Sequence, residues 1–322
     1  MVVIHAFLFK APHVLYNIVN NYYLPPVNGI DNVVLNFNAS SVWILNFCLA
    51  IIMFGIALDL RKTLFVNILR TPKSLIVGLV AQWIALPFFT YLLILLLEPQ
   101  PSIALGMILI AACPGGNISN FFSSLAKANV ELSIVMTSIS SVLAIILTPT
   151  LLTFYGNLYG PTREIMTTVS LDWWEVTRAI LLIIIIPIIL GQLFVRRFPA
   201  VADKIKGFLR ITSMLLFLLI VVGAFASNYE YFVDFVRLVF FFVLFHNLVA
   251  IFSGLGLGKL MKLDTDDVKS LSIEVGIQNS GLGLLLIFSF FSGLGGMAIV
   301  AAWWGIWHIV MGFILSFIWS KV

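Results

Sequence analysis

Long apolar runs repeat along most of the chain, and they constrain its fold more than any other feature. From about residue 41 onward, runs of 18 or more residues recur, each long enough to cross roughly 30 Å of hydrocarbon. Only 10% of the residues are charged, against about 25% in a typical soluble domain. A water-exposed globular surface needs more charge than this, so we expect a protein with several spans in a cell membrane or inner membrane.

The apolar runs predict an all-α polytopic protein with about nine transmembrane helices. The expected spans are roughly 41–60, 74–97, 102–126, 130–155, 177–195, 208–227, 236–259, 269–292 and 295–319. Helices are expected because a backbone exposed to lipid must satisfy its own hydrogen bonds, and the sequence lacks the short alternating segments of a β-barrel. Residues 1–40 hold no run of spanning length. We therefore expect an extramembrane or interfacial segment over 1–40 and a transmembrane domain over 41–322.

Lys and Arg residues are distributed unevenly between the two sides of these spans. Fourteen of the 18 fall in one set of loops and span ends, and only Lys10, Arg163, Arg178 and Arg237 fall in the other. Because Lys and Arg accumulate in cytoplasmic loops, we expect the N-terminus outside and the C-terminus in the cytoplasm. The same distribution accounts for the net charge of +4 without a nucleic-acid partner.

Glu274 is the single acidic residue in the interior of an expected span. It lies in the eighth span, whose interior contains no Lys or Arg. A buried carboxylate must be protonated, paired or bound to a cation. Since ionisable groups inside a membrane mark functional sites by default, Glu274 is a candidate functional residue; the alternative is a neutral Glu in an interhelical hydrogen bond.

Two of the expected spans contain helix-breaking residues. The third span contains Pro114–Gly116, and the eighth contains three glycines within 276–283. Proline removes a backbone donor and glycine weakens helical order, so each helix is expected to break. Paired discontinuous helices are typical of secondary transporters built from inverted repeats. Spans one to four and five to nine would be the two repeats, an inference from placement rather than from sequence identity.

Residues around the two breaks resemble motifs of the bile acid:sodium symporter family. Residues 113–120 (CPGGNISN) are similar to its first crossover motif, 132–137 (LSIVMT) to its next helix and 274–281 (EVGIQNSG) to its second crossover, while Gln82 matches a further position. The resemblance extends from about residue 41 to the C-terminus. It implies import of an organic anion, such as a bile acid or a small carboxylate, coupled to sodium.

By matching position, the resemblance implies two sodium sites that share one carboxylate. The first would use the side chains of Ser119, Asn120, Ser133, Thr137 and Glu274. The second would use the side chains of Gln82, Glu274 and Gln278 and the carbonyls of Val275 and Ile277. Each of these side chains supplies an oxygen, the ligand that a hard cation prefers.

The organic anion is expected near the crossing of the broken helices. Asn117 and Asn279 would face it beside free backbone N–H groups, and Ser119 would lie within reach. His308, a polar residue inside the ninth span, is a further candidate, with an interhelical hydrogen bond as its alternative role. Half-helix N-termini nearby would favour negative charge.

The resemblance also implies two bodies that move against each other. A core would contain spans two to four and seven to nine, and a panel would contain spans one, five and six. The substrate would bind in the crevice between them, and movement of the core against the panel would give alternating access. The expected partners are sodium ions, a small organic anion and membrane lipid, with no obligate protein partner inferred.

Two other classes of function stay open on the sequence alone. In a proton-coupled transporter Glu274 would alternate between protonated and charged forms, although a proton site needs only the carboxyl group and not a set of oxygen ligands. A passive channel or a receptor also accommodates broken helices. An enzyme is not expected, because the sequence contains no Gly-x-Ser-x-Gly element, no paired intramembrane Asp and no His-Glu-x-x-His element.

Overall fold

The computed structural model describes residues 27–35, 39–60, 66–68, 72–169 and 172–321, and these residues are helical almost throughout. The 3-10 helix η1 (Val27–Asn32) is followed by α2 (Ala39–Asp59), α4 (Pro72–Val80), η2 (Ala81–Ala85), α5 (Leu86–Leu97), α6 (Pro101–Ala111), α7 (Ile118–Leu125), α8 (Val130–Leu158), α9 (Gly160–Val169), α10 (Trp173–Arg197), α11 (Pro199–Ser227), α12 (Tyr229–Leu260), α13 (Thr265–Gly276), α14 (Ser280–Phe290) and α15 (Gly295–Trp319). In the described part of the chain, β pairing is limited to two isolated bridges.

Five helical segments are long and apolar enough to cross a membrane. They are Pro72–Leu97, Val130–Leu158, Trp173–Arg197, Tyr229–Leu260 and Gly295–Trp319, and shorter apolar helices cover Val42–Leu58, Pro101–Ala111 and Ser280–Phe290. Large apolar side chains such as Phe47 and Phe317, about two-thirds exposed in the isolated chain, suit a lipid environment. These features agree with a polytopic helical protein, while nine crossings and their orientation stay predictions.

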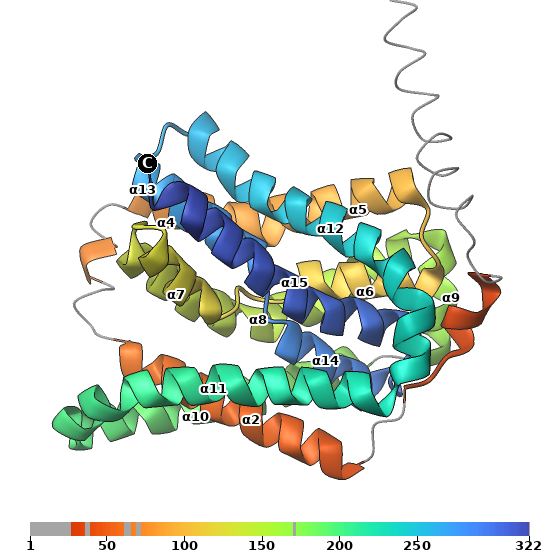
Figure 1. Ribbon diagram of the computed structural model, residues 1–322, viewed down its shortest axis with the longest axis horizontal. Helices are drawn as coiled ribbons and strands as arrows, with labels where there is room; N and C mark the ends of the chain where they lie inside the picture. The colour runs from red at the N-terminus through yellow and green to blue at the C-terminus, as the bar shows by residue number, and fades with distance from the viewer. Residues whose placement is uncertain (1–26, 36–38, 61–65, 69–71, 170–171, 322) are drawn as a thin grey trace, which may run out of the picture.

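Three helices lie together along one side of the molecule, at the bottom of Figure 1. In this layer α2 packs against both α10 and α11. Gly191 allows a close approach to α2, because a Cβ atom there would lie 2.9 Å from the carbonyl oxygen of Phe54. Gln192 adds a hydrogen bond from Nε2 to the carbonyl of Ala57 at 2.5 Å. These helices match expected spans one, five and six, and their movement as a panel stays a prediction.

Two short helices occupy the centre of the larger body. Every residue of 102–111 in α6 and of 280–287 in α14 is buried. A helix that is apolar all round is expected in such an interior position. Both pack against α15, and Gly106 allows close contact, because a Cβ there would lie 2.9 Å from the Cα of Met297. The two breaks that follow α6 and precede α14 are therefore held at the centre of the protein.

The described part of the N-terminal segment packs onto this central body. Asp31 accepts a hydrogen bond from the backbone N–H of Ser102, at the start of α6, at 2.8 Å. The N–H of Leu35 donates to Gly293 and the N–H of Gly295 donates to Val33. Most of the expected extramembrane segment 1–40 lies outside the described residues, and its location relative to the membrane stays a prediction.

The connection between the fourth and fifth expected spans contains an unexpected helix. The sequence indicated a connection over 156–176, but α8 continues to Leu158 and α9 occupies Gly160–Val169. Thr162 closes the turn between them by donating from Oγ1 to the carbonyl of Gly156 at 2.6 Å. The helix α9 is short and buries only Thr162 and Met166, so an apolar-run criterion does not detect it.

Candidate functional site

The two interrupted segments cross each other where their helices break. Helix α6 ends at Ala111 and α7 begins at Ile118, whereas α13 ends at Gly276 and α14 begins at Ser280. Between these ends, the N–H of Gly116 donates to the carbonyl of Ile277 at 2.7 Å, and the N–H of Asn279 donates to the carbonyl of Pro114 at 2.9 Å. Backbone groups freed by one break are thus satisfied by the other.

Glycine is required at this crossing because the two broken segments approach so closely. A Cβ atom at Gly116 would lie 2.9 Å from the carbonyl oxygen of Gln278. A Cβ atom at Gly115 would overlap Oε1 of Glu274. The motif that breaks the first helix therefore also makes room for the carboxylate carried by the second segment.

Glu274 is fully buried and accepts hydrogen bonds from three hydroxyl groups. Ser119 Oγ donates to Oε2 at 2.5 Å, Ser133 Oγ to Oε2 at 2.9 Å, and Thr137 Oγ1 to Oε1 at 2.6 Å. We call these three hydroxyls, with Glu274 and the side-chain amide of Asn120, the hydroxyl cluster. Among the described residues, no Lys or Arg forms an ion pair with Glu274.

The hydroxyl cluster brings together all five side chains expected at the first sodium site. The side-chain oxygen of Asn120 lies 2.8 Å from Ser133 Oγ and 3.4 Å from Thr137 Oγ1. A hydroxyl group has one proton to donate and two lone pairs. The hydroxyl oxygens therefore keep lone pairs for a cation after donating to Glu274.

A pair of glutamines meets at the second break, in which Gln278 itself lies. Gln82 Nε2 donates to Gln278 Oε1 at 2.8 Å, and Gln278 Nε2 donates to Gln82 Oε1 at 3.1 Å. Gln278 Nε2 also donates to the carbonyl of Val275 at 2.6 Å. We call these two side chains the amide pair. The structure brings together three of the five groups predicted for the second site, Gln82, Gln278 and the carbonyl of Val275. The Glu274 carboxylate instead accepts from the three hydroxyls, and the carbonyl of Ile277 accepts from Gly116.

Gln82 reaches the amide pair from a widened helical turn that sequence reasoning missed. The π-helix η2 covers Ala81–Ala85, and the N–H of Leu86 donates to the carbonyl of Ala81. Pro87 follows at once; it has no N–H, and its ring would crowd the carbonyl of Trp83 in a regular α-helix. A single-turn π-bulge relieves such crowding. Pro87 is therefore the feature of the sequence that could have indicated the widened turn.

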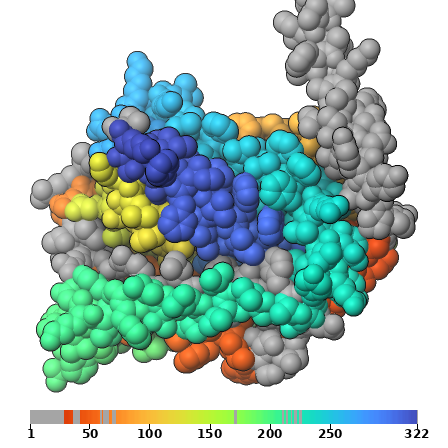
Figure 2. Space-filling view, in the orientation of Figure 1, coloured from red at the N-terminus to blue at the C-terminus, as the bar shows by residue number. Residues whose placement is uncertain are grey.

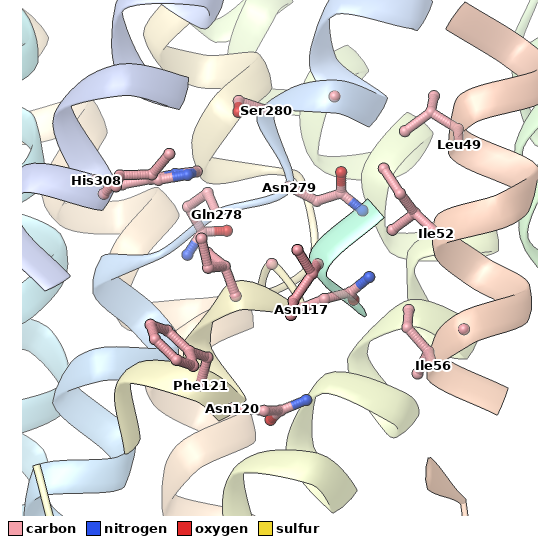
Figure 3. A pocket seen from close by; sticks show the side chains of 16 residues that line it. Leu49, Ile52, Ile56, Asn117, Asn120, Phe121, Gln278, Asn279, Ser280 and His308 are labelled. Atoms are coloured by element: carbon pink, nitrogen blue, oxygen red, sulfur yellow. The ribbon is translucent and has the colours of Figure 1, made fainter. Parts of the chain in front are cut away.

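A cavity of about 150 Å³ lies between the crossing and the panel-side helices α2 and α11. It is lined by Leu49, Ile52, Gly55, Ile56, Gly116, Asn117, Ile118, Asn120, Phe121, Ile211, Gln278, Asn279, Ser280, Gly281, His308 and Ile309. Figure 3 shows Asn117, Asn279 and His308 on one side and the apolar side chains of α2 on the other. Figure 2 shows α11, which contributes Ile211, along the lower edge of the molecule below α15.

Several polar atoms at this cavity lack a partner within the described residues. Asn117 Oδ1, Ser280 Oγ and His308 Nδ1 are buried and form no hydrogen bond there. Such atoms are satisfied when a ligand or water reaches them. Three of the four predicted substrate-contacting residues, Asn117, Asn279 and His308, thus line one cavity, whereas Ser119 does not line it and bonds to Glu274.

His246 and Asn247 are further buried polar residues on α12. His246 Nε2 lies 2.8 Å from Thr90 Oγ1, an interhelical hydrogen bond away from the residues that line the cavity. Asn247 instead donates to the carbonyl of Gly276 at the second break. Both lie in the expected span 236–259, and nothing in their spacing along the chain separates these two roles.

Known proteins match the chain over most of its length. Residues 46–235 match the Sodium Bile acid symporter family. An uncharacterized sodium-dependent transporter of Bacillus subtilis (strain 168) is 34% identical over 293 residues, 89% of this chain and 88% of that protein. The Arabidopsis thaliana protein named "Probable sodium/metabolite cotransporter BASS1, chloroplastic" is 26% identical over 273 residues, 85% of this chain and 66% of that protein.

The P3 protein of Bos taurus is also similar, with 30% identity over 244 residues, 73% of this chain and 48% of that protein. The relatives named for a function are transporters and not enzymes. Together with the five apolar spans, these matches identify a multi-pass membrane protein. The resemblance seen at the two crossover motifs is confirmed, and the chain belongs to the Sodium Bile acid symporter family.

Proposed function

We propose that this protein is a sodium-coupled symporter of an organic anion, with two sodium ions bound at the helix crossing. Membership of the Sodium Bile acid symporter family supports sodium coupling. The relative in Bacillus subtilis is named a sodium-dependent transporter, and the one in Arabidopsis thaliana a sodium/metabolite cotransporter. The observation that carries the proposal is Glu274, fully buried among hydroxyl oxygens.

The first sodium ion would bind in the hydroxyl cluster. Three neutral donors stabilise the Glu274 carboxylate, but they do not cancel its charge. A charge far from water is stable only when it is paired or bound to a metal ion. Sodium is a hard cation for which the hydroxyl and amide oxygens of Ser119, Asn120, Ser133 and Thr137 are suitable ligands.

The second sodium ion would bind between the amide pair and the second break. Gln82, Gln278 and the carbonyl of Val275 already lie within hydrogen-bonding distance of one another. Their oxygens accept N–H groups of the protein, so sodium would replace some of these hydrogen bonds. Glu274, one residue before Val275, would be shared between the two ions.

The substrate would occupy the cavity beside the crossing. Helices α7 and α14 begin next to Asn117 and Asn279, and helix N-termini favour anions. The residues of α2 supply an apolar wall. The cavity volume of about 150 Å³ is below the roughly 300–1,000 Å³ of drug-sized ligand sites, which favours a small carboxylate over a steroid-sized bile acid.

Transport would proceed by alternating access. The cavity lies between α2 and α11 on one side and the crossing on the other, so movement of the panel α2, α10 and α11 against the remaining core would open it alternately to the two faces. In this proposal the protein spans the membrane nine times with the N-terminus outside, and its two halves are inverted repeats.

The proposal is tested first by the thermal stability of the purified protein in sodium against choline at equal ionic strength. A ligand that binds only the folded state raises its stability, so sodium at about ten times its dissociation constant is expected to raise the Tm by at least roughly 2 °C. Glu274→Gln is expected to abolish the shift. Glu131→Gln, at an exposed position of α8, is the matched control and should keep it.

Uptake into proteoliposomes then separates the alternatives. A sodium gradient should drive accumulation of a small carboxylate by the wild type and not by Glu274→Gln. Equal melting in both cations, together with uptake that follows a proton gradient and ignores sodium, would overturn the proposal in favour of proton coupling.

A further inference from the structure

Asn247 contacts the second break from a helix that belongs to neither broken segment. It lies on α12, is fully buried, and donates from Nδ2 to the carbonyl of Gly276 at 2.7 Å. A carbonyl group can only accept a hydrogen bond, so the NH₂ end of the amide must face it. The opposite end, Oδ1, is buried and has no partner among the described residues.

The carbonyl of Gly276 needs such a donor because α13 ends there. In a continuous helix the N–H four residues later, that of Ser280, would donate to it. Here the N–H of Ser280 donates to the carbonyl of Gln278 at 2.9 Å. A buried carbonyl without a partner is strongly unfavourable in a membrane, and Asn247 removes this penalty from outside the break.

The same hydrogen bond determines which way the neighbouring carbonyls point. Ile277 is extended, with φ −117° and ψ 98°, and in an extended chain successive carbonyls point to opposite sides. The carbonyl of Gly276 faces α12, while that of Ile277 faces the first break and accepts from Gly116. Turning the Gly276 peptide would rotate the carbonyls proposed as sodium ligands.

Close packing of α12 on α13 leaves Asn247 little freedom. A Cβ at Gly254 of α12 would lie 2.6 Å from the carbonyl oxygen of Leu271, and one at Gly276 would lie 2.6 Å from Ile251 Cγ1. The backbones are therefore so close that the short side chain of Asn reaches the break. A longer side chain at position 247 would have to bend away.

We propose that Asn247 is a positioning residue for sodium coupling. It holds the Gly276 peptide so that the carbonyls of Val275 and Ile277 stay on the side of the crossing, next to the amide pair. The inference rests on the proposed sodium sites and adds to them a side chain that does not itself touch the ion.

The test is a sodium titration of thermal stability and of uptake with the variant Asn247→Leu. Leu is branched at Cγ as Asn is, in a larger side chain that has no donor, so the sodium concentration for half-maximal effect is expected to rise about tenfold. Thr90→Val is the matched control. It removes the buried hydrogen bond from α5 to His246, which lies on α12 next to Asn247. The sodium concentration for half-maximal effect should stay within about twofold of the wild-type value.

Two further variants keep the test decisive. Asn247→Ala, which also lacks the donor, must show the same rise and serves where the Leu variant does not fold. Asn247→Gln keeps an amide donor on a longer stem and is expected to fall between the wild type and the Leu variant. An unchanged half-saturation in Asn247→Ala, or an equal rise in Thr90→Val, would overturn the positioning role.

The same titration separates this inference from the function on which it rests. Absence of any sodium-specific stabilisation in the wild type would refute the sodium sites themselves. A normal sodium response in the wild type with unchanged variants would refute only the role of Asn247.

Discussion

The hydroxyl cluster and the amide pair lie on the same two breaks but differ in how their charges and hydrogen bonds balance. In the hydroxyl cluster a carboxylate accepts from three neutral hydroxyls, so its charge is unopposed. In the amide pair Gln82 and Gln278 satisfy each other, and no net charge is present. The first arrangement is stable when a cation or a proton neutralises the carboxyl group, whereas the second is stable without either.

This difference predicts unequal sodium sites. A cation entering the hydroxyl cluster gains a buried carboxylate as its partner, and that attraction is strong where the local dielectric constant is low. A cation entering at the amide pair must first replace hydrogen bonds that are already made. We therefore expect the hydroxyl cluster to bind sodium more tightly and to fill first.

The largest effect is expected from Gly115→Ala. The added Cβ would overlap Glu274 Oε1, and forced overlap in a packed interior costs about 1–3 kcal/mol. The carboxylate would move out of reach of its hydroxyl donors, so sodium affinity at both positions should fall by about a hundredfold. Sodium titration of the Tm measures this loss. The control is Gly160→Ala, which has open space around its Cβ and should keep the sodium affinity of the wild type.

A smaller effect, confined to the hydroxyl cluster, is expected from Thr137→Val. Val has the shape of Thr but lacks the hydroxyl that donates to Glu274. Hydrogen bonds to charged groups contribute about 1.5–3 kcal/mol, so sodium half-saturation should rise by roughly tenfold or more. Thr150→Val, at an exposed position of the same helix, should stay within about twofold. An equal rise in both variants would contradict a sodium site in the hydroxyl cluster.

The smallest effect on sodium affinity is expected from Gln82→Leu. The change should abolish the weaker sodium site, so that the sodium dependence of uptake loses its cooperativity, while tight binding changes by less than about threefold. It should also destabilise the fold by about 1–3 kcal/mol, because Gln278 is left partly unpaired. Adding Gln278→Leu should destabilise the protein less than the sum of the two single changes. A strong loss of tight binding in Gln82→Leu would mean that the two sites are not separate.

Much of the site could be predicted because its residues carry strong local signals. Pro114–Gly116 breaks a helix wherever it stands, and Glu274 is the only acidic residue in the interior of an expected span. Ser133 and Thr137 are four residues apart and therefore share one face of α8. These features predict, from the sequence alone, that the site lies where the two broken helices meet.

The remaining features depend on packing between segments distant in the chain. The wide turn at Gln82 depends on Pro87 and on the neighbouring helices, and the apolar cavity wall depends on where α2 lies. Ser119 shows the limit most clearly, since its place in the sequence suited both sodium and substrate, and only its contact with Glu274 assigns it to one side. Helix α9 was missed because its short polar sequence resembles a loop.

The mutual pairing of the two breaks has a consequence for synthesis and membrane insertion. Gly116 and Pro114 are satisfied by Ile277 and Asn279, which leave the ribosome only after most of the chain has been made. Until then the first broken segment lacks the backbone partners that the second break supplies. We therefore expect α6 and α7 to reach their final packing late in synthesis. Chains that end before residue 277 are expected to be recognised as incomplete and degraded.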